Sequence, residues 1–325
     1  MTLFTRCSVS LIAALCGPLH AAQPDAAAKY PDKPIRLIVP FSPGAGTDTT
    51  ARTIAQKLSE KWGQQVVTDN RPGAAGAIGV EYTMNANPDG HTICLVSASL
   101  STNSATNPKL PYDLTRDLQA ITQATSLFYV VYLNPSLPVK SVKELIAHAK
   151  ANPGKLNYGS SGTGGLQHFA GELFNHMAGV QMTHVPYKGA GTVIPAMLSN
   201  EVQVGYSTLF GVRPQVQAGR LRWIAITAAK RSAAVDLPTV AESGLPGYEV
   251  DQWYGIITSS KVPMPIVRKL NAAIVESLKS PDVIQRLASD GSTPVGSTPE
   301  QFGAHIRSEI AKWKKLVREA NITLQ

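Results

Sequence analysis

The chain has 325 residues, of which 43% are hydrophobic and 16% charged, a balance that excludes a disordered chain and suits a globular protein. This length is enough for two ordinary domains, each with its own core. The formal net charge is +8, but Lys and Arg occur singly or in pairs such as Lys230-Arg231, with no basic run interleaved with aromatic residues. We therefore expect no nucleic-acid partner, whereas the positive field favours encounter with anionic solutes.

The first residues follow the pattern of a secretory signal peptide. Arg6 is the only charge before Asp25, an apolar stretch runs from Val9 to Leu19, and small residues follow at Ala21-Ala22. The apolar stretch is too short to cross a bilayer as a helix. We therefore expect residues 1–22 to be a signal peptide that sends the chain to the periplasm.

Beyond this segment, short β-rich runs alternate with helical patterns. The sequence predicts strands at 35–40, 66–68, 92–96, 156–158, 183–185, 202–206 and 223–227. It predicts helices through 54–62, 78–84, 143–151, 166–177, 265–279 and 299–320. Such alternation favours an α/β fold of parallel sheets covered by helices. Because the pattern restarts after Pro138, we expect two units in tandem with a ligand cleft between them, at the carboxyl ends of the strands.

Four glycine-rich turns carry the most chemical information, because each is predicted to join a strand to a helix. Glycine lets the backbone turn tightly and approach a ligand closely. The first N–H groups of the following helix lack partners within it, and the helix dipole adds partial positive charge. Such turns are therefore candidate anion sites without a charged side chain. The four are FSPGAGTD at Phe41–Asp48, NRPGAAGAIG at Asn70–Gly79, YGSSGTGG at Tyr158–Gly165 and YKGAG at Tyr187–Gly191.

Enzyme motifs do not match these turns. Gly44 and Gly46 supply G-x-G, but Thr49 stands where a dinucleotide fingerprint needs its last glycine. YGSSGTGG fails the G-x-S-x-G pattern of a nucleophile elbow, and no H-E-x-x-H pair or Cys/His cluster suggests zinc. We expect no cofactor, no metal and no catalytic residues. An α/β enzyme that acts on a small carboxylate remains the alternative.

At these residues the chain resembles a known family, the periplasmic receptors of tripartite tricarboxylate transporters, or Bug and TctC-like proteins. The motifs run in order from YPDKPIRLIVPFSPGAGTD through VTDNRPGAAGAIG, YGSSGTGGLQHFAGELF, VPYKGAG, DLPTVAESGLPGYE and VDQWYGI to IRSEIAKWKKLVREANI, and cover nearly the whole chain after residue 22. The resemblance implies a two-lobed type II periplasmic-binding fold that closes on its ligand. It also implies two partners, a small organic carboxylate and the membrane subunits of a transporter. We expect a monomer that serves transport, ligand sensing or both.

The resemblance also implies the site residues. In the family, the first two turns hold one carboxylate of the ligand, largely through backbone groups and bound water, which assigns that role here to Phe41, Gly44, Ala45, Gly46, Thr47, Asp48, Ala75, Gly76 and Ala77. The second lobe supplies specificity, which we assign to Ser160, Ser161, Gly164, Gly165, His168, Tyr187 and Trp253. Two roles stay open for Asp48. It is either the N-cap of the first helix, which we favour, or a ligand contact through water or a hydroxyl.

One stretch, QVGYST at 203–208, departs from the family. Where relatives commonly carry an acid and an amide, this chain has Ser207 and Thr208, and Gly205 replaces a large side chain. Without the acid, a second anionic group on the ligand is repelled less. We therefore expect a mono- or dicarboxylate with no required amino group, aliphatic or aromatic, with extra room at Gly205. Flat apolar walls are expected from the aromatic residues that face the cleft, with candidates at Phe128, Phe210, Trp253 and Tyr254.

The family fold also implies two passages of the chain between lobes. The apolar runs at 121–133 and 250–257 are the candidates. Lobe one would then comprise residues 23–122 plus 252–325, and lobe two residues 123–251.

The signal-peptide pattern generates a test of export. We expect the mature protein to begin near Ala22 or Gln23 and to lie in the periplasm, because signal peptidase cleaves after small residues. Mass spectrometry of the native protein after fractionation measures this start point. An intact Met1 on the cytosolic protein would contradict the prediction.

Overall fold

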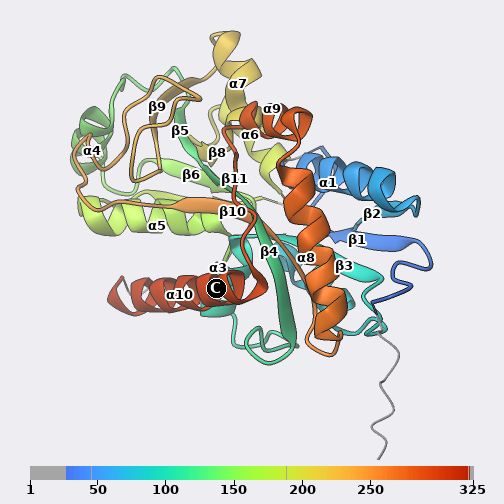
Figure 1. The fold of residues 1–325 in the computed structure, drawn as a ribbon. Coiled ribbons are helices and arrows are strands. Elements are labelled where there is room, and N and C mark those ends of the chain that lie inside the picture. The colour runs from blue at the N-terminus through green and yellow to red at the C-terminus, as the bar shows by residue number, and fades with distance from the viewer. Residues whose placement is uncertain (1–26, 45, 188, 321, 323–325) are drawn as a thin grey trace, which may run out of the picture.

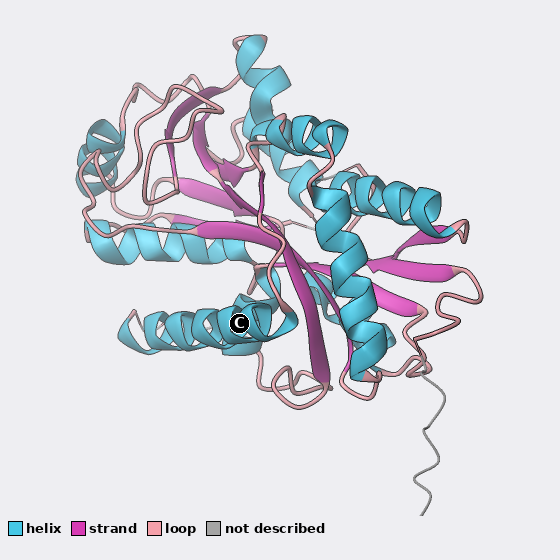
Figure 2. Ribbon diagram, in the orientation of Figure 1, coloured by secondary structure: helices cyan, strands magenta, loops and turns pink. Residues whose placement is uncertain are grey.

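The computed structural model describes residues 27–44, 46–187, 189–320 and 322, so the expected signal peptide and Ala45 lie outside the described residues. Two sheets form the centre of the fold (Figures 1 and 2). The six-stranded sheet has the order β11-β4-β10-β3-β1-β2, with strands β1 (Ile35–Val39), β2 (Val66–Asn70), β3 (Thr92–Ser97), β4 (Leu118–Phe128), β10 (Asp251–Ser259) and β11 (Thr293–Pro294). The five-stranded sheet has the order β7-β6-β8-β5-β9, with strands β5 (Val130–Leu133), β6 (Asn157–Ser160), β7 (Thr183–Pro186), β8 (Val204–Ser207) and β9 (Arg222–Ile226).

Helices cover both sheets on both faces. Over the six-stranded sheet, one face carries α1 (Gly46–Trp62), α8 (Met264–Leu278) and α9 (Pro281–Ala288), and the other carries α2 (Ala77–Met84), α3 (Ser99–Thr106) and α10 (Pro299–Glu319). A short 3-10 turn, η1 (Ala74–Gly76), precedes α2. The helices of the five-stranded sheet are α4 (Val142–Ala151), α5 (Leu166–Ala178), α6 (Ala190–Leu198) and α7 (Leu209–Gln217). The α/β class is therefore confirmed, and each of the four glycine-rich turns does join a strand to a helix.

The prediction of parallel sheets is wrong for part of each sheet. β1 pairs in parallel with β2 and β3, and β6 with β7 and β8, as expected for strands joined through helices. However, β10 runs antiparallel to β3 and β4, and β5 runs antiparallel to β8 and β9. The physical reason is connectivity, because the chain enters these strands from the other sheet rather than through a crossover helix.

The chain changes sheets within the expected apolar runs. β4 ends at Phe128 in the six-stranded sheet and β5 begins at Val130 in the five-stranded sheet, so Tyr129 alone separates them. The return occurs where β10 begins at Asp251. The lobe boundary at 122/123 falls inside β4 and stays a prediction, as does the boundary at 251/252.

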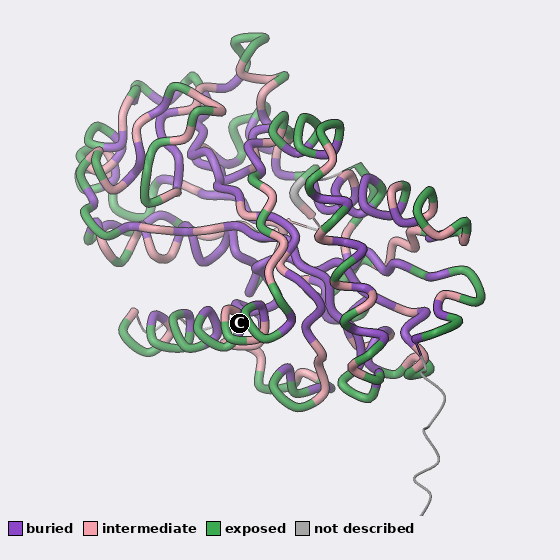
Figure 3. The backbone as a smooth tube through the Cα atoms, in the orientation of Figure 1, coloured by how far each residue is buried: buried purple, intermediate pink, exposed green. Residues whose placement is uncertain are grey.

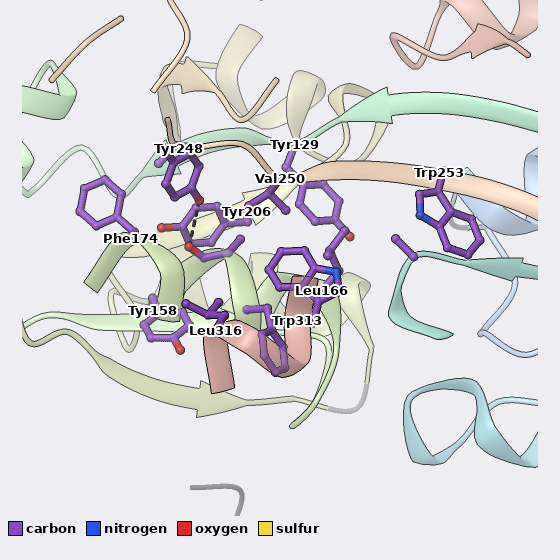
Figure 4. Close-up of a cluster of buried hydrophobic side chains, with 14 of the residues drawn as sticks. Tyr129, Tyr158, Leu166, Phe174, Tyr206, Tyr248, Val250, Trp253, Trp313 and Leu316 are labelled. Atoms are coloured by element: carbon purple, nitrogen blue, oxygen red, sulfur yellow. Dashed lines mark hydrogen bonds between the residues drawn. The ribbon is translucent and has the colours of Figure 1, made fainter. Parts of the chain in front are cut away.

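Buried side chains link the two sheets into one core, visible as continuous buried backbone in Figure 3. Trp313 on α10 lies with its ring centroid 5.5 Å from that of Phe169 on α5, and neither ring is exposed. Figure 4 shows Trp313 and Leu316 of α10 in one cluster with Leu166 of α5 and Tyr158 of β6. Each such fully buried side chain contributes about 1.5–3 kcal/mol, so α10 stabilises the junction.

Asp48 fixes the loop that joins β1 to α1. Its Oδ2 accepts hydrogen bonds from the Gly44 N–H at 3.1 Å and from Arg52 Nε at 2.9 Å, and its Oδ1 accepts one from Asn70 Nδ2 at 3.0 Å. Asn70 also donates to the Phe41 carbonyl at 3.0 Å. The expected N-cap position is wrong, because Asp48 lies inside the first turn of α1. The carboxylate instead reaches back to the loop and ties it to β2.

The Asp48 contacts predict a loss of stability on substitution. Burial alone would raise the pKa of Asp48, but the hydrogen bonds from Arg52, Asn70 and Gly44 outweigh it and lower the pKa. Asp48→Asn should reduce the unfolding free energy by about 1.5–3 kcal/mol, the usual worth of hydrogen bonds to a charged group. Urea denaturation of the ligand-free protein at pH 7 measures this.

Asp282→Asn is the matched control, because Asp282 forms an exposed pair with Lys57 at 2.7 Å and such pairs contribute little. A lowered pKa means that the Asp48 contribution is present above the unfolded pKa of about 3.9 and is lost as pH falls further. The difference between wild type and Asp48→Asn should therefore shrink below that pH. An unchanged stability at pH 7 would contradict the assignment.

Candidate ligand-binding site

A cavity of about 390 Å³ lies between the two sheets. It opens where the N-terminal ends of three helices meet, those of α1, α6 and α7. Its lining comes from both sheets and comprises Phe41, Ser42, Pro43, Gly44, Gly46, Thr47, Ser97, Ser99, Tyr129, Ser161, Gln167, Gly189, Gly191, Thr192, Ile194, Ser207, Thr208, Phe210, Gly211, Gln252 and Tyr254. This is the place that the α/β arrangement predicts for a ligand, at the carboxyl ends of the strands.

Two of these helix ends present backbone to the cavity. Gly46 and Thr47 open α1, and Gly191 and Thr192 lie in the first turn of α6. The first N–H groups of a helix have no partner within the helix and carry the positive end of its dipole. No Lys, Arg, His, Asp or Glu is among the described lining residues. The backbone dipoles of these helix ends can therefore hold an anionic group in the cavity.

Two buried amides hold the cavity wall in position. Gln167 Nε2 donates to the Tyr206 carbonyl at 2.6 Å, and Gln167 Oε1 accepts from the Ser161 N–H at 2.7 Å. Gln252 Nε2 donates to Tyr129 Oη at 2.9 Å, so that the Tyr129 hydroxyl is left to donate elsewhere. These contacts fix polar groups in advance of binding, which reduces the ordering cost of capturing a ligand.

A second cavity, of about 590 Å³, adjoins the first and contains the second glycine-rich turn. Four residues line both cavities, namely Phe41, Ser42, Ser161 and Gly189. Ala74 and Ala75 hold positive φ values of 47° and 52°, which non-glycine residues adopt rarely. Asn103 stabilises this turn by donating from Nδ2 to the Ala74 carbonyl at 3.1 Å. Strain of this kind is held where the surroundings fix the backbone, as at binding sites.

Many of the predicted site residues gather in these two cavities. The first is lined by Phe41, Gly44, Gly46, Thr47, Ser161, Ser207 and Thr208. The second is lined by Phe41, Ala75, Gly76, Ser161 and Tyr187. Ala77 begins α2 just behind this lining, and the structure does not describe Ala45. Two of the four aromatic candidates, Phe210 and Tyr254, line the first cavity.

The third glycine-rich turn supports the cleft from behind. Ser160 is fully buried, with its Oγ 2.6 Å from His184 Nε2. His168 stacks on His184 at 3.9 Å between ring centroids, and its Nδ1 accepts from the Gly164 N–H at 3.2 Å. Burial lowers the pKa of His168 to about 4 and that of His184 to about 3, so both rings are neutral. The structure places Ser160, Gly164 and His168 behind the cavity wall.

The N-terminus of α5, which follows this turn, already has a partner from the other sheet. The Leu166 N–H donates to Ser99 Oγ on α3 at 3.2 Å. Gly165 precedes Leu166, and a Cβ added there would lie 3.3 Å from the Gly162 carbonyl. This helix end therefore joins the two halves of the molecule rather than facing the open cavity.

Trp253 lies in the core. Its ring packs edge-on against Phe302 at 5.3 Å and His305 at 5.5 Å between centroids, and it has no exposed area. Successive side chains of a strand point to opposite faces, so Tyr254 faces the cavity while Trp253 points away, toward α10. Figure 4 shows the Trp253 indole apart from the Tyr129 ring. Phe128 likewise packs in a buried cluster, with Val130 and Leu209.

The expectation of extra room for a ligand at Gly205 is wrong. A Cβ added to Gly205 would lie 2.4 Å from the Tyr132 ring, which already fills that space. Tyr132 stands opposite Gly205 on the neighbouring strand β5 and is buried. The small residue therefore admits a tyrosine of the chain itself, not a larger ligand.

Asp290 is the residue that sequence reasoning missed. It follows α9, and its Oδ1 accepts a hydrogen bond from the Phe210 N–H at the start of α7 at 2.8 Å. Ser207 stands where relatives commonly carry an acid, but an acid from another segment lies at this end of the cleft, behind the residues that line the cavity. No local pattern around Asp290 marks it, and only the fold brings it to α7. Gln167 could have been found, since it is a polar residue on the apolar face of α5.

Within the described residues, no helix has the length and apolar character needed to cross a membrane.

Residues 50–322 match the model of the tripartite tricarboxylate transporter family receptor. Protein BugT of Bordetella pertussis is 35% identical over 307 residues, covering 94% of each chain. A solved structure of a periplasmic transporter is 41% identical with a TM-score of 0.86, covering 91% of this chain and all of that one. R. palustris Rpa4515, solved with adipate, is 35% identical with a TM-score of 0.86, covering 90% of this chain and 99% of that one. The chain thus belongs to the receptor family of the tripartite tricarboxylate transporters, whose fold is that of two-lobed periplasmic binding proteins.

Proposed function

We propose that this protein captures a small organic carboxylate in the cleft between its sheets and delivers it to the membrane subunits of a tripartite transporter. One observation carries the proposal. The N-terminal turns of α1 and α6 face a cavity whose described lining has no charged side chain. A carboxylate is one of the small anions that such backbone groups hold without a metal or an ion pair.

The size of the cavity supports the same ligand class. A volume of about 390 Å³ lies in the lower part of the range for small-molecule sites. Phe210 and Tyr254 supply aromatic surface, and Gln167 and Gln252 supply fixed polar groups. The adipate carried by the relative from R. palustris is itself a small carboxylate. An aliphatic or aromatic acid with one carboxylate at the α1 and α6 ends suits this lining.

An enzymatic role would need a nucleophile that substrate can reach. The contact between Ser160 Oγ and His184 Nε2 at 2.6 Å has the geometry of a nucleophile and its base. However, Ser160 is fully buried and neither residue lines the described cavities. The pair is better explained as a support for the loop at Ser161, so we propose binding without chemistry.

We propose that the receptor acts as a monomer in the periplasm. The signal-peptide pattern of residues 1–22 supports export, and the family supports partnership with two kinds of transporter subunit. A periplasmic sensor would use the same cleft with a different partner. Uptake of the identified ligand by cells with and without this protein separates the two roles.

A carboxylate screen tests capture in the cleft. We expect one or more small carboxylates to raise the melting temperature of the purified mature protein, because a ligand at about 100 times its dissociation constant adds about 2.7 kcal/mol. Thr192→Trp should abolish this shift, since Thr192 is exposed on α6 and an indole there would fill the cavity. Thermal-shift measurements followed by calorimetry with the best ligand provide the readout.

Ala151→Trp is the control, because Ala151 is exposed at the end of α4, away from the cleft. Both variants should melt near the wild-type temperature without ligand. Carboxylate binding that survives Thr192→Trp would place the site elsewhere. A screen in which only uncharged or cationic compounds bind would overturn the proposed ligand class.

A further inference from the structure

A carboxylate of the protein itself lies at the third helix end of the cavity. Asp290 belongs to the segment between α9 and β11 of the six-stranded sheet, whereas α7 belongs to the five-stranded sheet. Its Oδ1 accepts the Phe210 N–H at 2.8 Å, and the Thr208 side chain hydrogen-bonds to the same carboxylate. This contact brings the segment that follows α9 next to the start of α7. The first turn of α7 is therefore already occupied by an anion.

The second oxygen of this carboxylate lies close to the first turn of α1. A Cβ added to Gly46 would be 2.7 Å from Asp290 Oδ2 and 2.7 Å from Tyr254 Oη. Gly46, Thr208, Phe210 and Tyr254 all line the cavity. Asp290 therefore sits directly behind the wall at this end, between the N-termini of α1 and α7.

Asp290 carries a charge at neutral pH. Burial raises its pKa to about 6, while the hydrogen bonds from Phe210 and Thr208 and the field of Arg213 on α7 oppose that rise. Tyr254 on β10 and Tyr129, between β4 and β5, have pKa values raised by burial and by this carboxylate, so both stay neutral. The α7 end of the cavity, with the adjoining first turn of α1, is thus negative, whereas the α6 end carries the positive sign of a helix dipole alone.

We propose that Asp290 is a specificity-determining residue that excludes a second carboxylate from the α7 end of the cavity, so that the protein selects monocarboxylates whose far end is neutral or cationic. This inference rests on the proposed carboxylate site and narrows its substrate class. A second carboxylate at α7 would meet a like charge and find the Phe210 N–H already bonded. Two like charges brought together in a binding site repel each other, and this repulsion costs binding free energy.

Matched acids of equal length test the proposal. The pairs are butyrate and succinate, hexanoate and adipate, and 4-methylbenzoate and terephthalate, measured by titration calorimetry at pH 7.5. In each pair that binds wild type, the monocarboxylate should bind more tightly by about tenfold or more. Asp290→Asn keeps the shape and an oxygen that accepts the Phe210 N–H, but removes the charge. It should reduce this ratio to near one, mainly by improving dicarboxylate binding.

Two further variants separate charge selection from a structural role. Asp236→Asn removes an equal charge from a fully exposed position in the same half as α7, beside Arg231 at 4.0 Å, and should leave every ratio unchanged. Asp290→Glu retains the charge and should retain the preference for the monocarboxylate. A purely structural Asp290 would change both members of a pair alike, because lost stability does not distinguish one ligand from another.

The outcomes are distinct. If the wild-type protein binds each dicarboxylate as tightly as the matching monocarboxylate, the proposal is overturned. This test needs no variant, so it holds even if Asp290→Asn fails to fold. An unchanged ratio in a folded Asp290→Asn would overturn it as well, while carboxylate capture would stand. If no acid in the panel or the wider screen binds, the proposed function fails, and the inference fails with it.

Discussion

The cleft depends on one constraint: the N–H groups that begin each helix around it need an acceptor. The chain supplies that acceptor at two helix starts, because Ser99 accepts from the start of α5 and Asp290 accepts from the start of α7. Asp48 accepts instead from Gly44, in the loop before α1. The first turns of α1 and α6 remain directed at the cavity. In the proposed function, the position of an anionic ligand follows from which helix ends face the cavity.

The same acceptors hold the two halves of the molecule together. Ser99 and Asp290 belong to the part built on the six-stranded sheet, and each bonds the first turn of a helix that covers the five-stranded sheet. Below the cleft, Trp313 of α10 contacts Phe169 of α5 in the shared core. Polar contacts at the mouth and apolar contacts at the base thus fix the cleft from two sides, which favours a preformed cavity over one assembled by the ligand.

Periodicity and glycine-rich turns were enough to predict the α/β class and the strand-to-helix position of all four turns, whereas the individual site residues came from the family resemblance. These features are local, because a turn and the helix after it are adjacent in sequence. The rest depended on contacts distant in sequence. Asp290 meets Phe210 from 80 residues away, and Tyr132 fills the space beside Gly205 from another strand. Trp253 lies on the side of β10 that packs against α10. β10 is buried on both faces, so an alternating sequence pattern could not predict which side Trp253 would take.

The single residue between β4 and β5 bears on how a ligand would leave. Tyr129 lies at the passage between the sheets, and its hydroxyl bonds to Gln252 on β10, the strand by which the chain returns. Both residues line the cavity, so a bound molecule rests against the connecting strands as well as between the two halves. Points near a rotation axis move least. Any rotation of one half about this passage would therefore separate α1 from α6 and α7 first, while Tyr129 and Gln252 stayed close together. The ligand would lose its carboxylate contacts early and its contacts at the axis late, so its anionic end would be exposed first to whatever accepts it.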